Sequence, residues 1–340
     1  MRILGKDTPN VLSLYTTLVL SAEKRAIEDK SERNLIFARV LGYALLYPLS
    51  SEAQTYLESK LAFLNRYSDD AVKLREAYQL GEVYLKDFIS IFKNARGRTS
   101  CTSDDSPPTF YDNDKQTQEK MKDSHINPRD HLSTKEAALV RDDFRCMVTR
   151  RVDVESLEHH KTESRHRELG TDSQCCYIFP ELLGNAAARG PNAKLWDILE
   201  AFGYGDICKE LSAETAGSNI HRLENIMTLD PTICGLFDKQ KLWFEDIRNE
   251  EHCYKVCLAR HVPRLGIPET VRFENHANYA YPLPSPRYLQ IHAHCCRIAH
   301  LSGGAQYLDS RLRDIEETHV LSTDGSSSDV LDYALNRVIV

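Results

Sequence analysis

The first hundred residues carry hydrophobic side chains at helical spacing. One apolar stripe begins at Ala53, just after Ser51, a residue type suited to capping a helix N-terminus. A second amphipathic stretch covers 70–95 and is followed by Gly97, the residue type that most often closes a helix. Such stripes are typical of core packing, so we expect a helical N-terminal region at 1–97.

This pattern breaks at 98–132, where polar residues predominate and two prolines are adjacent. A segment with so few apolar side chains cannot offset the chain entropy that is lost on folding. We therefore expect 98–132 to be a flexible linker and the first site of proteolytic cleavage.

Short apolar runs and amphipathic stretches alternate after the linker. Ser133 and Glu136 have the spacing of a capping box, which predicts that a helix begins there. The charged stretch 150–172 has no periodicity and is expected to be an insertion loop. We expect strands at 144–148, 175–179, 226–229, 242–244, 254–258 and 271–273, and helices at 137–142, 193–202, 231–237 and from Pro286 to Gly303.

This mixture of elements predicts an α+β fold with two main parts. The helical N-terminal region would precede a domain at 133–310, which holds all the expected strands. A C-terminal tail at 311–340 would be rich in serine and would carry one short helix at 330–338.

Charge and composition restrict the classes of function. The formal net charge is −7, which argues against a protein that coats nucleic acid through a broad basic surface, although a local contact with nucleic acid stays open. No secretion signal is recognisable, and the apolar run at 41–49 is short and interrupted by Pro48. We therefore expect a soluble protein inside the cell, in the cytoplasm or nucleus, that has no contact with membranes.

The chain has 10 cysteines, but none forms a CxxC pair. In a chain of this length they do not indicate a disulfide scaffold. The simplest interpretation is reduced and mostly buried thiols.

Four motifs occur in an order that resembles the fungal HNH endonuclease family. They are RDDFRCMVT at 141–149, CYIFP at 176–180, ENIMTL at 224–229 with CGLFD at 234–238 and LWFE at 242–245, and LPSPRYLQIH at 283–292 with LSGG at 301–304. The resemblance covers roughly 133–309 and, more weakly, the N-terminal helices.

The resemblance implies a β-hairpin followed by a helix, the ββα-metal fold, which grips one divalent metal ion. In this family a histidine at the end of the first strand acts as general base, an asparagine orients it, and a histidine on the helix binds the metal. The matching positions here are Tyr177, Asn225 and Cys234. The two motif histidines are thus replaced, by Tyr177 and Cys234.

These replacements predict a loss of nuclease activity. A tyrosine hydroxyl has an unperturbed pKa of about 10 and is a poor general base at neutral pH, so Tyr177 is more simply a packing residue. A cysteine at 234 favours zinc over magnesium. Cys234 with Cys146 and either Cys175 or Cys176 could form a zinc site, and buried free thiols are the alternative.

Other polar groups near these motifs have two interpretations each. His160 and His166 could replace the missing base, or could lie on a solvated loop. Late-helix histidines such as His292 could bind a ligand or simply be buried. Four arginines could contact phosphate or pair with nearby acidic residues. They are Arg141, Arg145, Arg150 and Arg151.

Three functions therefore compete. The first is an HNH-nuclease-like pseudoenzyme with a degenerate active site. The second is a scaffold recruited as an accessory protein to fungal secondary-metabolite biosynthesis, which would have a closed apolar pocket. The third is an active metal-dependent endonuclease with relocated ligands.

Overall fold

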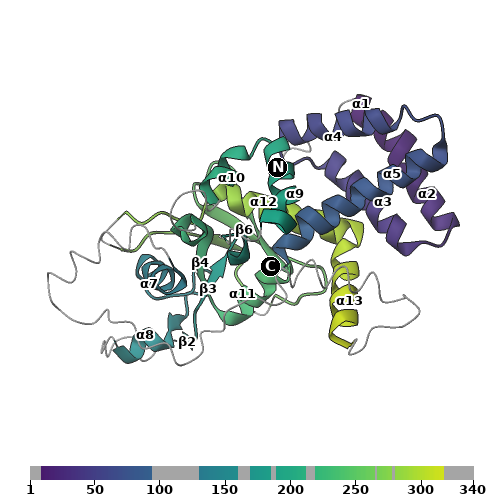
Figure 1. Cartoon of the computed structure of the whole chain (residues 1–340). Coiled ribbons are helices and arrows are strands. Elements are labelled where there is room, and N and C mark those ends of the chain that lie inside the picture. Colours follow the sequence, from purple (N-terminus) through teal and green to yellow (C-terminus); the bar gives the residue numbers. More distant parts are fainter. Residues whose placement is uncertain are drawn as a thin grey trace. The chain divides into compact units, whose positions relative to one another are not determined.

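A computed structural model (Figure 1) describes 9–93, 130–159, 169–184, 189–211, 219–264, 266–277 and 280–317. Its contacts divide the chain into two compact units. The first comprises Met1–Lys93, Ala186–Glu210 and His294–Val340, and the second comprises Asn94–Asn185 and Leu211–Ala293. Helices and small sheets are both present, which confirms the α+β class.

Every described element of the first unit is helical. The elements are α1 (Pro9–Leu14), η1 (Tyr15–Val19), α2 (Leu20–Glu28), α3 (Glu32–Leu46), α4 (Ser51–Leu64), α5 (Asp70–Val83), η2 (Tyr84–Ile89), η3 (Ser90–Phe92), α9 (Arg189–Ala201), α10 (Gly205–Leu211) and α13 (Gly304–Glu317). The expected helix at 70–95 is thus an α-helix that continues through a π-helical turn, η2, and ends at Phe92. Gly97 and nearly all of the expected linker lie outside the described residues.

Polar side chains fix where the N-terminal helices begin. Ser50, and not the expected Ser51, caps α4, because its hydroxyl accepts a hydrogen bond from the Ala53 amide at 2.9 Å. The same hydroxyl donates to the carbonyl of Phe202 at 2.7 Å, so the cap also ties α4 to a residue much later in the chain.

Long-range contacts explain why the first unit is discontinuous. The Phe202 ring stacks on Tyr84 with ring centroids 5.9 Å apart. The buried Lys93 ammonium lies 2.7 Å from the Asp309 carboxylate and donates to the Ala305 carbonyl at 3.1 Å. Residues 189–210 and 294–317 therefore pack with the N-terminal helices, whereas the sequence pattern placed most of them in a domain at 133–310.

The second unit combines short strands with helices. Its elements are α7 (His131–Arg141), β1 (Val152–Asp153), α8 (Val154–His159), β2 (Gly170–Thr171), β3 (Gln174–Tyr177), η5 (Glu181–Gly184), η7 (Asn219–His221), η8 (Leu223–Asn225), β4 (Ile226–Leu229), α11 (Pro231–Asp238), β5 (Leu242–Asp246), β6 (Cys253–Leu258) and β7 (Thr270–Arg272). Helix α12 (Pro286–Ser302) begins in this unit and ends in the first.

Strands β3 and β4 form an antiparallel pair, with Gln174 opposite Leu229 and Tyr177 opposite Ile226. Helix α11 follows β4 directly (Figure 1). It begins there because Asp230 accepts a hydrogen bond from the Thr232 amide at 2.8 Å and proline occupies the first turn. The strand expected at 226–229 and the helix expected at 231–237 are confirmed.

The strands β5, β6 and β7 form an antiparallel sheet in that order, close to the three runs predicted from sequence. Phe244 of β5 is buried there and contacts the ring of Phe273, with centroids 5.4 Å apart. Alternating buried and more exposed positions in β5 match the period of two that predicted it.

Two expectations near the start of the second unit are wrong. Residues 144–148 are not a strand; Asp143 and Phe144 have positive φ angles, and Arg145 forms only an isolated bridge with Val152. The stretch 150–172 is not simply a loop, because β1, α8 and β2 lie within it. Its short elements are below the length at which periodicity can be recognised.

Helix α7 begins earlier than the Ser133 capping box predicted. Asp130 is the N-cap, and its carboxylate accepts a hydrogen bond from the Ser133 amide at 2.8 Å. Ser133 therefore lies in the first turn of the helix. Aspartate and serine cap helices about equally well, so the sequence pattern could not decide between Asp130 and Ser133 as the N-cap.

The expected boundary at 310 falls inside a helix. Gly303 adopts a positive φ of 83°, which ends α12 as predicted, but α13 then continues to Glu317. The short helix expected at 330–338 lies outside the described residues. None of the described helices combines the length and apolarity that a membrane crossing requires.

Candidate functional site: two faces of strand β3

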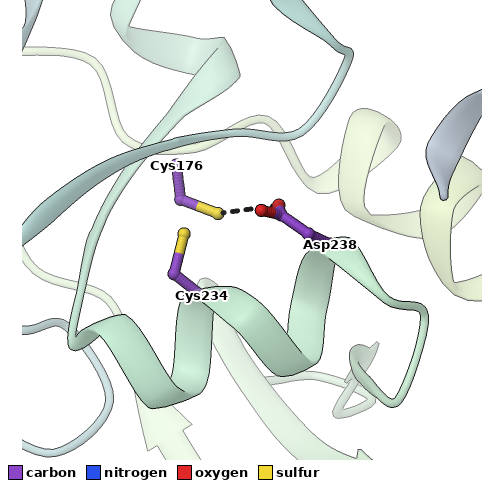
Figure 2. Close-up of side chains that lie close together, drawn as sticks. All are labelled: Cys176, Cys234 and Asp238. Atoms are coloured by element: carbon purple, nitrogen blue, oxygen red, sulfur yellow. Dashed lines mark hydrogen bonds between the residues drawn. The ribbon is translucent and has the colours of Figure 1, made fainter. Parts of the chain in front are cut away.

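Neighbouring residues of β3 point to opposite faces of the strand, as the two-residue period of a strand requires. Cys176 is fully buried and points toward α11 (Figure 2). Cys175 and Tyr177 instead pack against buried residues that include Ala137 and Ala138 of α7. The two candidate positions Cys176 and Tyr177 therefore belong to different environments.

Two thiols and a carboxylate meet on the α11 face of β3. The Sγ atoms of Cys176 and Cys234 and a carboxylate oxygen of Asp238 all lie within 4.8 Å of one another. Figure 2 shows Cys234 and Asp238 on one side of α11, as their i, i+4 spacing dictates, and both pointing toward Cys176. We call these three residues the thiol cluster.

Burial separates the thiol cluster from solvent. Cys176 and Cys234 are each 0% exposed, while Asp238 is only partly buried. The Cys176 thiol donates a hydrogen bond to the Asp238 carboxylate at 3.7 Å (Figure 2). Asp238 is thus the most exposed of the three residues.

The donor atoms of the thiol cluster suit a soft divalent cation. Zinc takes thiolate and carboxylate ligands in a tetrahedral arrangement, and three protein ligands leave one position for water or a further ligand. Magnesium and calcium prefer sites built from oxygen atoms, of which this cluster offers one carboxylate. Without a cation, the Cys176 thiol has the Asp238 carboxylate as its hydrogen-bond partner.

The other cysteines considered for a zinc site do not join this cluster. Cys146 is buried, and its sulfur accepts a hydrogen bond from the Thr149 amide at 3.3 Å. Cys175 packs on the α7 side of β3. Of the two vicinal cysteines, the pleat of the strand therefore selects Cys176.

Asn225 has a structural role at this place. Its side chain is fully buried, accepts a hydrogen bond from the Phe179 amide at 2.8 Å, and donates to the carbonyls of Phe179 and Ile220, each at 3.0 Å. All these polar groups belong to the main chain. Asn225 thus fixes the segment that leaves β3 against the turn that precedes β4.

On the opposite face, the hydroxyl of Tyr177 lies between two imidazoles. It is 2.8 Å from Nδ1 of His221 and 3.2 Å from Nδ1 of His131. The His131 ring stacks on Tyr177, and the His221 ring meets it edge-on. Nε2 of His221 lies 4.0 Å from a carboxylate oxygen of Glu181. We call His131, Tyr177, Glu181 and His221 the tyrosine cluster.

The charges around His221 have opposing effects. Burial lowers the pKa of this imidazole, while the nearby carboxylates of Glu181 and Asp130 raise it and His131 lowers it further. The net result is a pKa below the usual value of 6.5. His221 is therefore a neutral base at physiological pH.

Ion pairs with acidic residues form at three of the four arginines that were considered for phosphate contact, Arg141, Arg145 and Arg151. Arg141 is fully buried and bonds to Asp142 through two nitrogens, at 2.8 and 3.0 Å. It also donates to main-chain carbonyls of Leu223 and Ile226. Arg145 pairs with Asp143 at 3.2 Å. These guanidinium groups connect parts of the second unit.

The remaining candidate residues are histidines, of which some are buried and others lie outside the described residues. His292 is buried and stacks on Phe237 of α11, with ring centroids 3.8 Å apart, and burial lowers its pKa to about 3. A neutral, stacked ring fits a core role. His160 and His166 lie outside the described residues.

The sequence did not reveal several members of these clusters. Asp238 was part of a quoted motif, and its i, i+4 spacing from Cys234 was the signal that places both on one helix face. His131 and His221 are separated from Tyr177 by 46 and 44 residues, and no local pattern connects them.

No protein-family model, no curated protein and no solved structure matches this chain. The resemblance to the HNH endonuclease family therefore rests on the motifs and on the order of the elements that carry them.

Proposed function

We propose that the chain is an HNH-nuclease-like protein whose hairpin–helix unit binds zinc and does not hydrolyse nucleic acid. The observation that carries the proposal is the thiol cluster, in which Cys234, the residue at the final histidine position of the motif, meets Cys176 and Asp238. The antiparallel pair β3–β4 followed by α11 is the order of elements that the motif resemblance implies.

Two features support the absence of nuclease activity. Thiolate ligands favour zinc over the hard cations that commonly assist phosphodiester cleavage. The hydroxyl at the general-base position, that of Tyr177, forms hydrogen bonds with His131 and His221 on the opposite face of the strand from the thiol cluster. A water molecule held by a metal at the thiol cluster would therefore have no base at this position.

Titration of the full-length, reduced protein with zinc and with cobalt tests the metal site. We expect one equivalent of zinc to bind, and cobalt to give the intense sulfur-to-metal absorption band of a thiolate complex. The variants Cys176→Ser and Cys234→Ser should lose the band. Cys257→Ser, which changes a partly buried cysteine of β6 in the same unit, is the matched control and should keep it.

A plasmid-cleavage assay of the same samples tests the second half of the proposal. We expect no cutting with zinc, magnesium or manganese. Cutting by the zinc-loaded protein that disappears in Cys234→Ser would overturn the proposal in favour of an active nuclease. Failure of zinc to bind at one equivalent would leave two buried structural thiols and would refute the metal site.

A further inference from the structure

The geometry of the tyrosine cluster determines which imidazole can take up the hydroxyl proton of Tyr177. A phenol has one proton, so it can donate to only one of the two imidazoles and must accept from the other. The carboxylate of Glu181 lies 4.0 Å from Nε2 of His221, which is too far for a direct hydrogen bond. Its negative charge nevertheless favours the ring proton on Nε2, the nitrogen that faces it, and so leaves Nδ1 as an acceptor.

The direction of the remaining bonds follows from this tautomer. Tyr177 donates its proton to Nδ1 of His221 across 2.8 Å. Its oxygen then accepts from Nδ1–H of His131 across 3.2 Å. A donor directed at the oxygen stabilises the phenolate that forms when the proton moves to His221. The two imidazoles thus have different roles: one removes the proton and the other stabilises the resulting charge.

These groups are the parts of an activated nucleophile: a hydroxyl, a base within hydrogen-bond reach, and a carboxylate whose charge favours the reactive tautomer of the base. We propose that Tyr177 is a nucleophile that accepts an acyl group, with His221 as its general base and His131 as a donor to the phenol oxygen. Glu181 acts through its charge on His221. The proposal does not depend on zinc or on the thiol cluster.

The charges around the phenol select the class of substrate. Asp130 and Glu181 both act on His221, so an approaching phosphodiester would meet two nearby carboxylates, whereas an acyl compound without charge at its reacting group would not. The leaving group is restricted as well. Attack by a phenol goes forward only if the group that is expelled is at least as acidic as a phenol. The substrate is therefore an aryl ester or a thioester and not an amide or an alkyl ester.

The step balances without another reactant. The oxygen of Tyr177 bonds to the carbonyl carbon while its proton passes to Nδ1 of His221. The bond from carbonyl carbon to leaving group breaks, and the leaving phenol or thiol takes that proton. The products are an acyl ester on Tyr177 and a free phenol or thiol, and neutral His221 is restored.

The test uses the full-length protein and p-nitrophenyl acetate, with a chelator present so that zinc plays no part. We expect a burst of about one p-nitrophenolate per chain and one acetyl group on Tyr177 in peptide mass spectra. Ethyl acetate should leave Tyr177 without an acetyl group, and bis-p-nitrophenyl phosphate should give no burst. Acetylation confined to other residues, or a faster burst with the phosphodiester, would overturn the proposal.

Variants test whether Tyr177 reacts because His221 activates it or only because a tyrosine is exposed. Tyr177→Phe should abolish the burst, and His221→Gln should slow it roughly 100-fold, the usual contribution of a general base. Tyr67→Phe, which changes a tyrosine that is 37% exposed in the first unit, is the control and should leave the burst unchanged. Equal labelling of Tyr67 and Tyr177 in the parent protein would refute a specific activation.

The pH profile of the parent protein gives a readout that does not depend on any variant folding. The burst rate should be on its plateau at neutral pH and should fall with acid as His221 takes up a proton, because burial holds the pKa of that imidazole below 6.5. Glu181→Gln removes a carboxylate that raises this pKa, so it should shift the acid limb to lower pH. A rate that instead rises steadily up to the pKa of free phenol would show that His221 takes no part.

Discussion

The two faces of β3 differ in solvent access and in the chemistry of their side chains. On the α11 face, Cys176 and Cys234 are each fully buried, and the carboxylate of Asp238 lies beside them. On the α7 face, Tyr177 is half-buried and its hydroxyl lies within hydrogen-bond distance of two imidazoles. One step along a strand thus separates ligands suited to a soft metal from groups suited to proton transfer.

The largest effect should come from Arg141, whose side chain joins α7 to the segment that enters β4. Arg141→Ala leaves Asp142 buried without its guanidinium partner and releases the carbonyls of Leu223 and Ile226. Breaking a buried ion pair on one side costs about 3–5 kcal/mol of unfolding free energy. Urea denaturation should show this loss.

The matched control for this prediction replaces both partners. Arg141→Met with Asp142→Leu leaves no unpaired charge and should therefore recover part of the stability lost in Arg141→Ala. An equal loss in the double variant would mean that the carbonyl contacts, and not the ion pair, account for the stabilisation.

The α11 face should be sensitive to acid through His292. Burial lowers its pKa to about 3 in the folded protein, while an unfolded histidine titrates near 6.5. The stabilisation from the neutral ring is complete above pH 6.5 and is lost as pH falls toward 3, at about 1.4 kcal/mol for each unit, or about 3 kcal/mol at pH 4.

The variant His292→Gln isolates this contribution. His294, whose pKa is also lowered to about 3, remains in that variant and retains its own acid sensitivity. Denaturation curves between pH 7 and 4 should therefore have a shallower pH dependence in His292→Gln than in the parent. If the unfolding free energies of the two proteins fall equally with pH, His292 is not a source of acid sensitivity.

Loss of the Asn225 side chain should lower stability and disturb the tyrosine cluster. Asn225→Ala leaves main-chain groups of Phe179 and Ile220 buried without this partner, which costs about 2 kcal/mol. Because Ile220 precedes His221 and Phe179 lies two residues after Tyr177, the variant should also slow acylation of Tyr177. Unchanged acylation at reduced stability would show that the Asn225 hydrogen bonds do not position Tyr177 and His221.

The smallest effect concerns Glu136 of α7 and has the opposite pH dependence from His292. Burial and the charge of Asp130 raise the pKa of Glu136 to about 7. Its contribution to stability is complete below about pH 4.5 and is lost as pH rises toward 7, where the folded protein must ionise it.

Glu136→Gln should therefore stabilise the protein at pH 8 and not at pH 4. The side chain is about half-exposed, so solvent screening limits the gain to about 1 kcal/mol. Thermal denaturation at the two pH values measures it. A gain of equal size at both would indicate helix propensity and not charge.

The elements that the sequence predicted well are those with a local signal. The strand β4 and the helices α11 and α12 were found because a proline, a glycine or an apolar repeat marks their ends. β3 was also located, but the direction in which its side chains face depends on what packs against each side. Cys176 and Tyr177 therefore could be named from the sequence without being assigned to separate clusters.

The tyrosine cluster could not be predicted for a related reason. Its members come from α7, β3, η5 and η7, which are brought together by the packing of the whole second unit. The 144–148 strand was predicted wrongly because apolar composition does not reveal the positive φ angles at Asp143 and Phe144 that turn the chain instead.

The discontinuity of the first unit has a consequence for synthesis on the ribosome. The buried Lys93 ammonium bonds to the carbonyl of Ala305, 212 residues later. At about 5–20 residues per second, roughly ten to forty seconds pass between translation of Lys93 and translation of Ala305. During this interval Lys93 and the apolar faces around it remain exposed to solvent. We therefore expect chaperones to bind the newly made N-terminal helices until the last third of the chain has emerged.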